Sequence, residues 1–132
     1  IKYNVPILIH AFHKHVGLLP DESTGFHVAN LAKRYPESKL IMAHMGGNAY
    51  HGIKYVKGLP NVWTDISRSN HRSGEIEYTV KHLGEDRVLF GTDAYMVLFH
   101  TNIGKLNEAD ISKEAKEKIF WKNAVELFGE EL

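Results

Sequence analysis

The sequence has no cysteine, no net charge and no long hydrophobic run. Because cysteine is absent, the chain cannot form a disulfide, a thiolate metal site or a cysteine nucleophile. Its 16 Lys and Arg residues balance its 16 Asp and Glu residues, so we expect neither nucleic acid nor an anionic membrane as a partner. Apolar runs such as residues 5–9 fall far short of the roughly 20 residues that cross a bilayer. We therefore predict a soluble, cytoplasmic protein that recognises a small molecule at a local site.

The length and composition fit a single domain, residues 1–132. A chain of 132 residues with 43% hydrophobic residues can bury about two thirds of its unfolded surface. The sequence starts at Ile1 and an apolar run follows almost at once, which indicates a part of a longer protein. Nine histidines are a high share for this length, and histidine is both a common acid/base group and a common metal ligand.

Strands and helices are predicted to alternate along the whole chain. Four continuous apolar runs read as strands covered on both faces, at residues 5–10, 39–44, 61–66 and 87–92. Helical patterns lie at residues 25–34, 49–57 and 74–83, around Ile103, and at 112–128. Such alternation predicts parallel strands whose carboxyl ends share one side. Four strands make half of an eight-stranded barrel or a thin open sheet, and periodicity does not choose between them.

An ionisable residue stands at or near the carboxyl end of each predicted strand: His10, His44, Asp65 and Asp93. Two imidazoles and a carboxylate suit zinc or another first-row divalent metal, with water in an open position. Such a metal acidifies the water, and a nearby carboxylate or imidazole can take and return the proton. The constellation forms only if the sheet is parallel.

Several segments together resemble one enzyme family. They are PILIH at residues 6–10, LIMAHMGG at 40–47, NVWTD at 61–65, RVLFGTD at 87–93, and Asn123-Ala124. The ordered set resembles the amidohydrolase-related family, which includes metal-dependent decarboxylases similar to aminocarboxymuconate-semialdehyde decarboxylase. The resemblance implies an α/β chain that is the C-terminal half, strands five to eight, of a TIM-type (β/α)8 barrel.

The resemblance also implies roles for single residues. His10 matches a metal ligand, and Asp93 matches an aspartate that binds the metal and handles the proton of the reacting water. His44 matches a catalytic acid/base, or a second ligand in binuclear relatives, while Asp65 is expected to be structural. The implied cofactor is a divalent metal, with zinc ahead of manganese on ligand type. The implied reaction is hydrolysis of a C–N or ester bond, or decarboxylation of a small carboxylic acid.

The chain departs from the family pattern because it has no His-x-His pair on a first strand. His13-Lys14-His15 has that spacing but follows the first predicted strand, where we expect a solvated loop with His13 as a candidate substrate contact. Arg68 and His71 are further candidates, to bind a substrate carboxylate. We expect an N-terminal half-barrel polypeptide or self-association, because four strands cannot close a barrel.

Other interpretations stay open or are disfavoured. A non-catalytic half-barrel that serves as a binding or assembly module remains possible without the missing ligands. A receiver-like domain with Asp65 as phosphoacceptor requires acids where Ala11 and Phe12 stand. A two-histidine, one-carboxylate iron oxygenase fits the parallel α/β pattern poorly. Gly46-Gly47 is expected to allow a tight turn beside His44 and not to bind an anion.

Overall fold

A computed structural model describes residues 3–68 and 72–129 of the chain. Its centre is a parallel sheet with the strand order β1-β2-β3-β4. The strands are β1 (Ile7–Ile9), β2 (Leu40–Met42), β3 (Val62–Asp65) and β4 (Val88–Leu89). The register pairs Leu8 with Ile41, Ile41 with Trp63, and Asp65 with Leu89. Neighbours in sequence are thus neighbours in the sheet, as in a (β/α)8 barrel.

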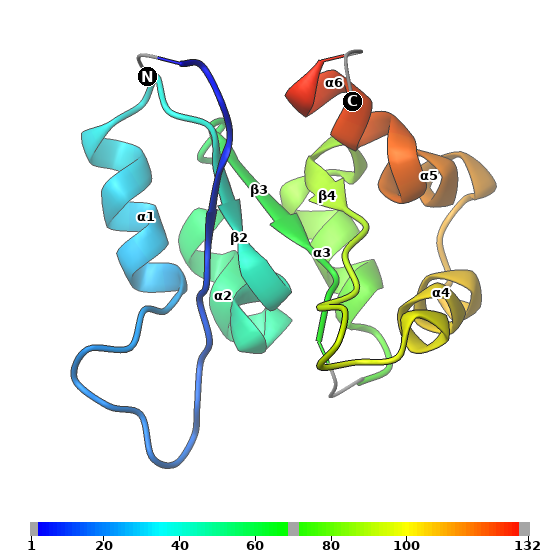
Figure 1. Cartoon of the computed structure of the whole chain (residues 1–132), viewed down its shortest axis with the longest axis horizontal. Coiled ribbons are helices and arrows are strands. Elements are labelled where there is room, and N and C mark those ends of the chain that lie inside the picture. Colours follow the sequence, from blue (N-terminus) through cyan, green and yellow to red (C-terminus); the bar gives the residue numbers. More distant parts are fainter. Residues whose placement is uncertain (1–2, 69–71, 130–132) are drawn as a thin grey trace.

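Helices connect the strands and extend the chain beyond β4. They are α1 (Gly25–Arg34), η1 (Ala43–Gly47), α2 (Ala49–Val56), α3 (Glu75–Leu83), η2 (Glu85–Arg87), α4 (Phe99–Glu108), α5 (Lys113–Glu117), η3 (Lys118–Lys122) and α6 (Asn123–Phe128). Figure 1 shows α1 beside one end of the sheet and α4 to α6 grouped at the other. None of the helices in the described ranges is long and apolar enough to cross a membrane.

The main core lies between the sheet and its helices. Buried side chains of β2, β3 and β4 pack there against those of α1, α2 and α3. These residues are Leu40, Met42, Val62 and Val88 from the strands and Val28, Ile53, Val56 and Ile76 from the helices. On the opposite face of the sheet, Ile41 and Leu89 form a smaller cluster with Leu127 of α6, and Trp63 packs against it. Strand side chains alternate between the two faces, so β2 and β3 are covered on both, as their continuous apolar runs predicted.

The strands are shorter than predicted, and three of the four expected strand-end residues, His10, His44 and Asp93, lie beyond them. The prediction that His44 ends a strand was wrong, because β2 ends at Met42 and the backbone turns left-handed at His44, with φ 61°. Asp93 lies past β4, where Phe90 N–H has already left the ladder to donate to Ile119 O at 2.8 Å. His44 and Asp93 are therefore held by turns and not by the sheet.

The helical predictions were closer. Residues 25–34 form α1 as predicted, and α2 and α3 differ from prediction by one residue at one end. The helix expected around Ile103 is α4, with ten residues. The final helix begins at Lys113 and is interrupted by the π-helical turn η3, in which Ile119 O accepts the bond from Phe90. This bond anchors the C-terminal helices to the end of β4.

Candidate functional site

A cavity of about 430 Å³ lies where the four strands end. Its walls come from β1, from the segments that follow β2 and β4, and from the end of β3, and its lining is Leu8, His10, Ala43, His44, Asp65, Ser67, Gly91, Thr92 and Asp93. All four ionisable residues predicted at strand ends line it. The carboxyl ends of parallel strands are where (β/α)8 barrels carry their active sites. We call this cavity the mouth site.

The turn that carries His44 is shaped by glycine. His44, Met45, Gly46 and Gly47 all have positive φ, a conformation that costs a side-chain-bearing residue roughly 1–2 kcal/mol. A Cβ on Gly47 would lie 2.7 Å from the backbone nitrogen of His13. The glycines therefore allow the tight turn predicted beside His44, and they let the segment after β1 pass close to it.

A chain of hydrogen bonds fixes the His44 ring. Asp65 Oδ1 accepts from His44 N–H at 3.0 Å and from Ser67 N–H at 2.9 Å, and it also accepts from the Ser67 hydroxyl. His44 Nδ1 lies 2.8 Å from Ser67 Oγ and 3.0 Å from Ser67 O. A carbonyl only accepts, and the Ser67 proton goes to Asp65, so His44 Nδ1 must be the donor. Asp65 thus has the hydrogen-bonded position expected of a structural residue.

This assignment leaves the lone pair of neutral His44 on Nε2, which lies 3.2 Å from His10 Nδ1. The two rings meet edge to face, with centroids 5.0 Å apart. His10 Nδ1–H is then the donor to His44, and its Nε2 keeps a lone pair of the kind that binds a metal. A metal-binding histidine commonly donates its other N–H to a neighbour in this way.

Asp93 reaches the mouth site from the turn after β4. Its φ is 56°, and its backbone carbonyl accepts from Met96 N–H and Val97 N–H, both at 3.1 Å. The side chain is exposed. A divalent ion bound by His10 and Asp93 has imidazole and carboxylate ligands, which suit zinc or manganese. The fold brings His10, His44 and Asp93 to one cavity, and their assigned roles remain predictions.

The residues predicted to bind substrate lie apart from these three. Arg68 and His13 line a second hollow of about 230 Å³, beside the turn that carries His44. Arg68 is 3% exposed, donates to Gly47 O at 2.6 Å and pairs with Glu75 at 3.3 Å. Burial lowers its pKa below the ordinary value, and Glu75 opposes that shift. His71 lies outside the described residues.

The three remaining site features were missed in the sequence. Ser67 orients His44, and its place just after a predicted strand was the available signal. Lys105 of α4 donates to Ile66 O, and burial, reinforced by Arg68, lowers its pKa to about 8. His51 of α2 is half-buried and stacks on His13. Burial lowers the pKa of His51, and His13 and Lys54 lower it further.

Residues 1–129 match the sequence model of a family described as amidohydrolase. The chain belongs to the amidohydrolase family. No curated protein matches the chain. The family match confirms the predicted resemblance and extends over nearly the whole sequence.

Solved structures with this fold include two enzymes with stated substrates or ligands. One is a dihydroxybenzoic acid decarboxylase from Polaromonas with bound manganese and 2-nitroresorcinol, at 22% identity and TM-score 0.69, over 96% of this chain and 50% of that one. Another is 2,6-dihydroxybenzoate decarboxylase with 2,6-dihydroxybenzoate, at 20% identity and TM-score 0.69, over 96% and 52%.

A TIM-barrel protein from Bordetella bronchiseptica has the same fold, at 18% identity and TM-score 0.74, over 96% of this chain and 46% of that one. An amidohydrolase from Burkholderia multivorans with bound zinc matches at 14% identity and TM-score 0.63, over 76% and 47%. These likenesses confirm the predicted half of a TIM-type barrel. The chain spans about half the length of these structures.

Proposed function

We propose that this chain is the C-terminal half of the barrel of a metal-dependent enzyme that decarboxylates or hydrolyses a small carboxylic acid. The observation that carries the proposal is the chain of hydrogen bonds from Asp65 through Ser67 to His44, which faces a cavity shared with His10 and Asp93. An oriented imidazole beside two candidate metal ligands provides the groups that metal-assisted acid/base catalysis needs.

The residues that line the mouth site have separate roles in this proposal. His10 and Asp93 would hold a divalent metal, which polarises a substrate oxygen or acidifies a bound water. His44 exchanges a proton at Nε2, where it must first release the hydrogen bond from His10 Nδ1–H, because its Nδ1–H is committed to Ser67. Asp65 keeps that orientation by accepting the Ser67 hydroxyl proton in a hydrogen bond. In decarboxylation the carbon that loses CO₂ needs one proton, and in hydrolysis the water must lose one.

Decarboxylation is the reaction to test first, because two structures with this fold are decarboxylases of dihydroxybenzoic acids. Zinc and manganese are both candidate metals, since each is bound in a structure with this fold. A second aromatic acid and a simple ester should be tried beside 2,6-dihydroxybenzoate. Hydrolysis of the ester without CO₂ release would favour the hydrolytic form of the proposal.

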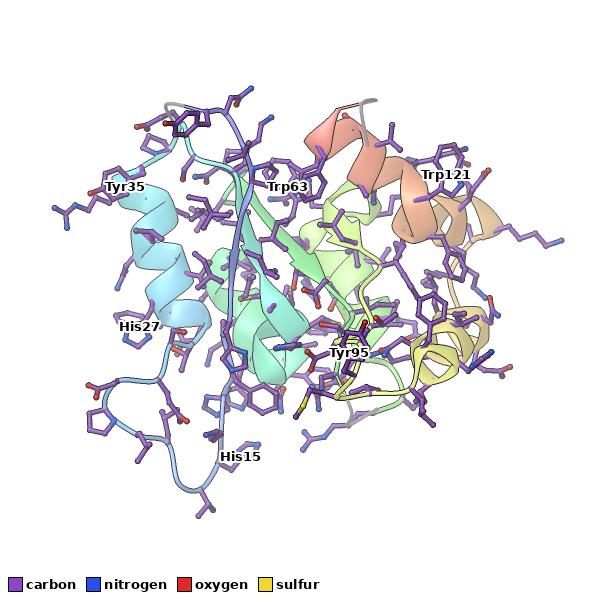
Figure 2. All side chains as sticks on the ribbon, in the orientation of Figure 1. His15, His27, Tyr35, Trp63, Tyr95 and Trp121 are labelled. Atoms are coloured by element: carbon purple, nitrogen blue, oxygen red, sulfur yellow. The ribbon has the colours of Figure 1, made fainter. Side chains whose placement is uncertain are left out.

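The remaining ligands and strands must come from outside these residues. Val5, Ile7 and Leu8 are 47–63% exposed at the β1 edge, and Tyr95 is fully exposed on the loop after β4 (Figure 2). Apolar exposure along the β1 edge of the sheet fits a barrel completed by an N-terminal half-barrel polypeptide or by a second copy. Intact-mass analysis of the native material distinguishes these, and a lone 15.0 kDa monomer would contradict both.

The test of catalysis compares His44→Gln with His82→Gln in the complete protein. His82 is exposed on α3 and lies outside the mouth site, so its replacement should leave turnover unchanged. Loss of a general acid/base typically costs 10²–10⁴-fold in rate, and we expect His44→Gln to lower kcat within that range. Equal turnover in the two variants would refute the role of His44.

A further inference from the structure

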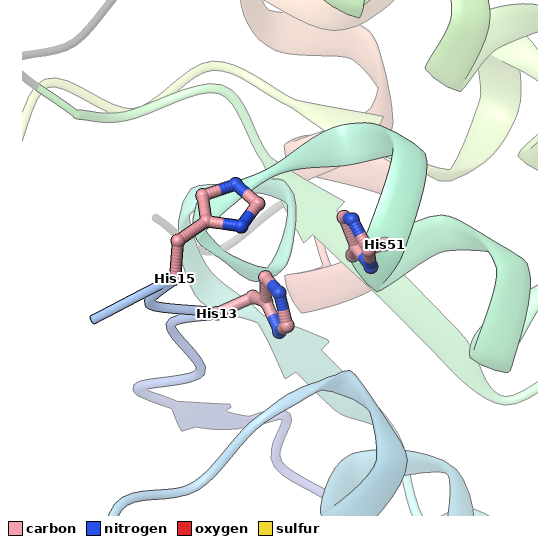
Figure 3. Close-up of side chains that lie close together, drawn as sticks. All are labelled: His13, His15 and His51. Atoms are coloured by element: carbon pink, nitrogen blue, oxygen red, sulfur yellow. The ribbon is translucent and has the colours of Figure 1, made fainter. Parts of the chain in front are cut away.

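A second group of histidines lies outside the mouth site. His13 and His15 follow β1 and His51 belongs to α2, and the figure shows the three imidazoles grouped (Figure 3). Their candidate ligand nitrogens all lie within 4.8 Å of one another. Within residues 3–68 and 72–129, no other three His, Cys, Asp or Glu residues gather as closely for a metal. None of the three lines the mouth site.

The fold itself brings two of these histidines together. His13 N–H donates to Gly46 O at 2.8 Å, so its backbone is tied to the turn that carries His44. His51 N–H donates to Asn48 O at 3.0 Å in the first turn of α2, which starts directly after the same turn. The backbone positions of His13 and His51 are therefore both set by the turn that carries His44 and the helix start that follows it.

The rings are arranged as a stacked pair with a third ring across it. His13 and His51 stack with centroids 4.1 Å apart and planes 10° from parallel. His15 stands nearly perpendicular to both, at 5.2 Å from His13 and 5.7 Å from His51. No hydrogen bond of the described residues involves the ring nitrogens of these three histidines. Among residues 3–68 and 72–129, no partner takes up their ring nitrogens.

We propose that His13, His15 and His51 bind a second divalent ion of the zinc class. Imidazole nitrogen suits zinc, copper and nickel, and three protein ligands leave a fourth position for water or a small anion. Four-coordinate zinc with bonds of 2.0–2.1 Å places its ligand atoms about 3.3 Å apart. The nitrogens lie within 4.8 Å of one another, so they must close by at most about 1.5 Å. His15, exposed on a loop, can move, and the His13 and His51 rings must also turn out of their parallel stack so that both lone pairs point at one ion.

Arg68, Arg72 and Lys54 place positive charge around the cluster, so a bound dication needs an anionic fourth ligand there. Lys14 lies between two of the histidines, but its charge is paired with Glu22. Arg72 lines the hollow that His13 and His15 also line, and it is exposed. A bound dication with chloride, carboxylate or hydroxide in the fourth position places negative charge beside that guanidinium.

The test counts zinc ions per chain in the complete protein without a polyhistidine tag. Chelator-treated protein is dialysed against Zn²⁺, and bound zinc is measured for the wild type, His15→Ala, His51→Ala and His100→Ala. His100 is an exposed histidine of α4 and is the matched control. We expect His15→Ala and His51→Ala each to bind one zinc ion fewer than wild type, and His100→Ala to bind the same number as wild type.

The same experiment separates this site from the mouth site. His10→Ala should remove a different ion, so the double variant His10→Ala with His15→Ala should lose two. Replacing one ligand should weaken zinc binding at least about 10- to 100-fold, since loss of an outer-shell partner alone costs that much. Because His15 is exposed, circular dichroism of His15→Ala should match wild type. Unchanged zinc content and affinity in folded His15→Ala and His51→Ala would overturn the proposal and leave a solvated histidine loop.

Discussion

The buried ion pair between Arg68 and Glu75 offers the sharpest test of how the mouth site is supported. Both side chains are almost wholly buried, at 3% and 2% exposure, and Arg68 Nη1 lies 3.3 Å from Glu75 Oε2. Arg68 also donates to Gly47 O, and Glu75 Oε1 accepts from Ala49 N–H at 3.3 Å. The pair thus joins the segments after β3 to both ends of the turn that carries His44.

Glu75→Gln removes the charge and keeps the shape. Removing one partner of a buried pair costs about 3–5 kcal/mol, because the other charge stays buried without compensation. Glutamine can still accept a hydrogen bond from Ala49 N–H, and Arg68 keeps its hydrogen bond to Gly47 O. We therefore expect a loss of unfolding free energy at the lower end of that range, about 3 kcal/mol. That is a large share of the 5–15 kcal/mol that stabilises a typical domain.

Urea unfolding followed by circular dichroism measures this loss. Glu37→Gln, at an exposed position, is the control and should change the free energy of unfolding by less than about 0.5 kcal/mol. The double variant Arg68→Met with Glu75→Gln should recover part of the loss, because no uncompensated charge remains. A change for Glu75→Gln as small as that of Glu37→Gln would refute the reasoning.

Three further predictions follow from single contacts. Gly47→Ala should destabilise the protein by about 1–3 kcal/mol more than Gly58→Ala in urea unfolding, because both have positive φ but only Gly47 has backbone 2.7 Å from the added Cβ; equal losses would contradict the close approach. Ser67→Ala should lower kcat about 10- to 100-fold, with exposed Ser73→Ala unchanged, because His44 loses the hydroxyl beside Nδ1; unaltered kcat would argue against that orientation. The pKa of Lys105 is lowered to about 8 in the folded protein, so the unfolded chain binds more protons between pH 8 and the ordinary value of 10.5. The free energy of unfolding, relative to Lys105→Met, should therefore rise across that window by on the order of 1 kcal/mol, since Lys105 is partly exposed, and a flat difference would contradict the shift.

The order of elements could be read from the sequence because apolar runs and helical patterns alternate regularly. The strand-end residues were also found, since the carboxyl ends of parallel strands share one side whatever the strand lengths. The left-handed turn at His44 could not be read, because non-glycine residues seldom adopt positive φ and the pattern LIMAH simply continued the strand.

The environments of charged groups were equally hidden. Arg68 was expected to meet substrate, and its buried pairing with Glu75 depends on how α3 packs against the turn after β2. The stacking of His51 on His13 joins residues 38 positions apart and follows from the Gly46–His13 backbone bond. Neither contact leaves a periodic signal in one sequence.

The central claim is that His10 and Asp93 bind a divalent metal at the ends of the strands. Its most direct test is metal binding by the complete protein, measured by equilibrium dialysis with Zn²⁺ and Mn²⁺ for wild type and Asp93→Asn. Asp110→Asn, at an exposed position outside both histidine groups, is the control. The account predicts that Asp93→Asn loses one bound ion, or binds it far more weakly, while Asp110→Asn matches wild type. Identical metal content and affinity in all three proteins would contradict it.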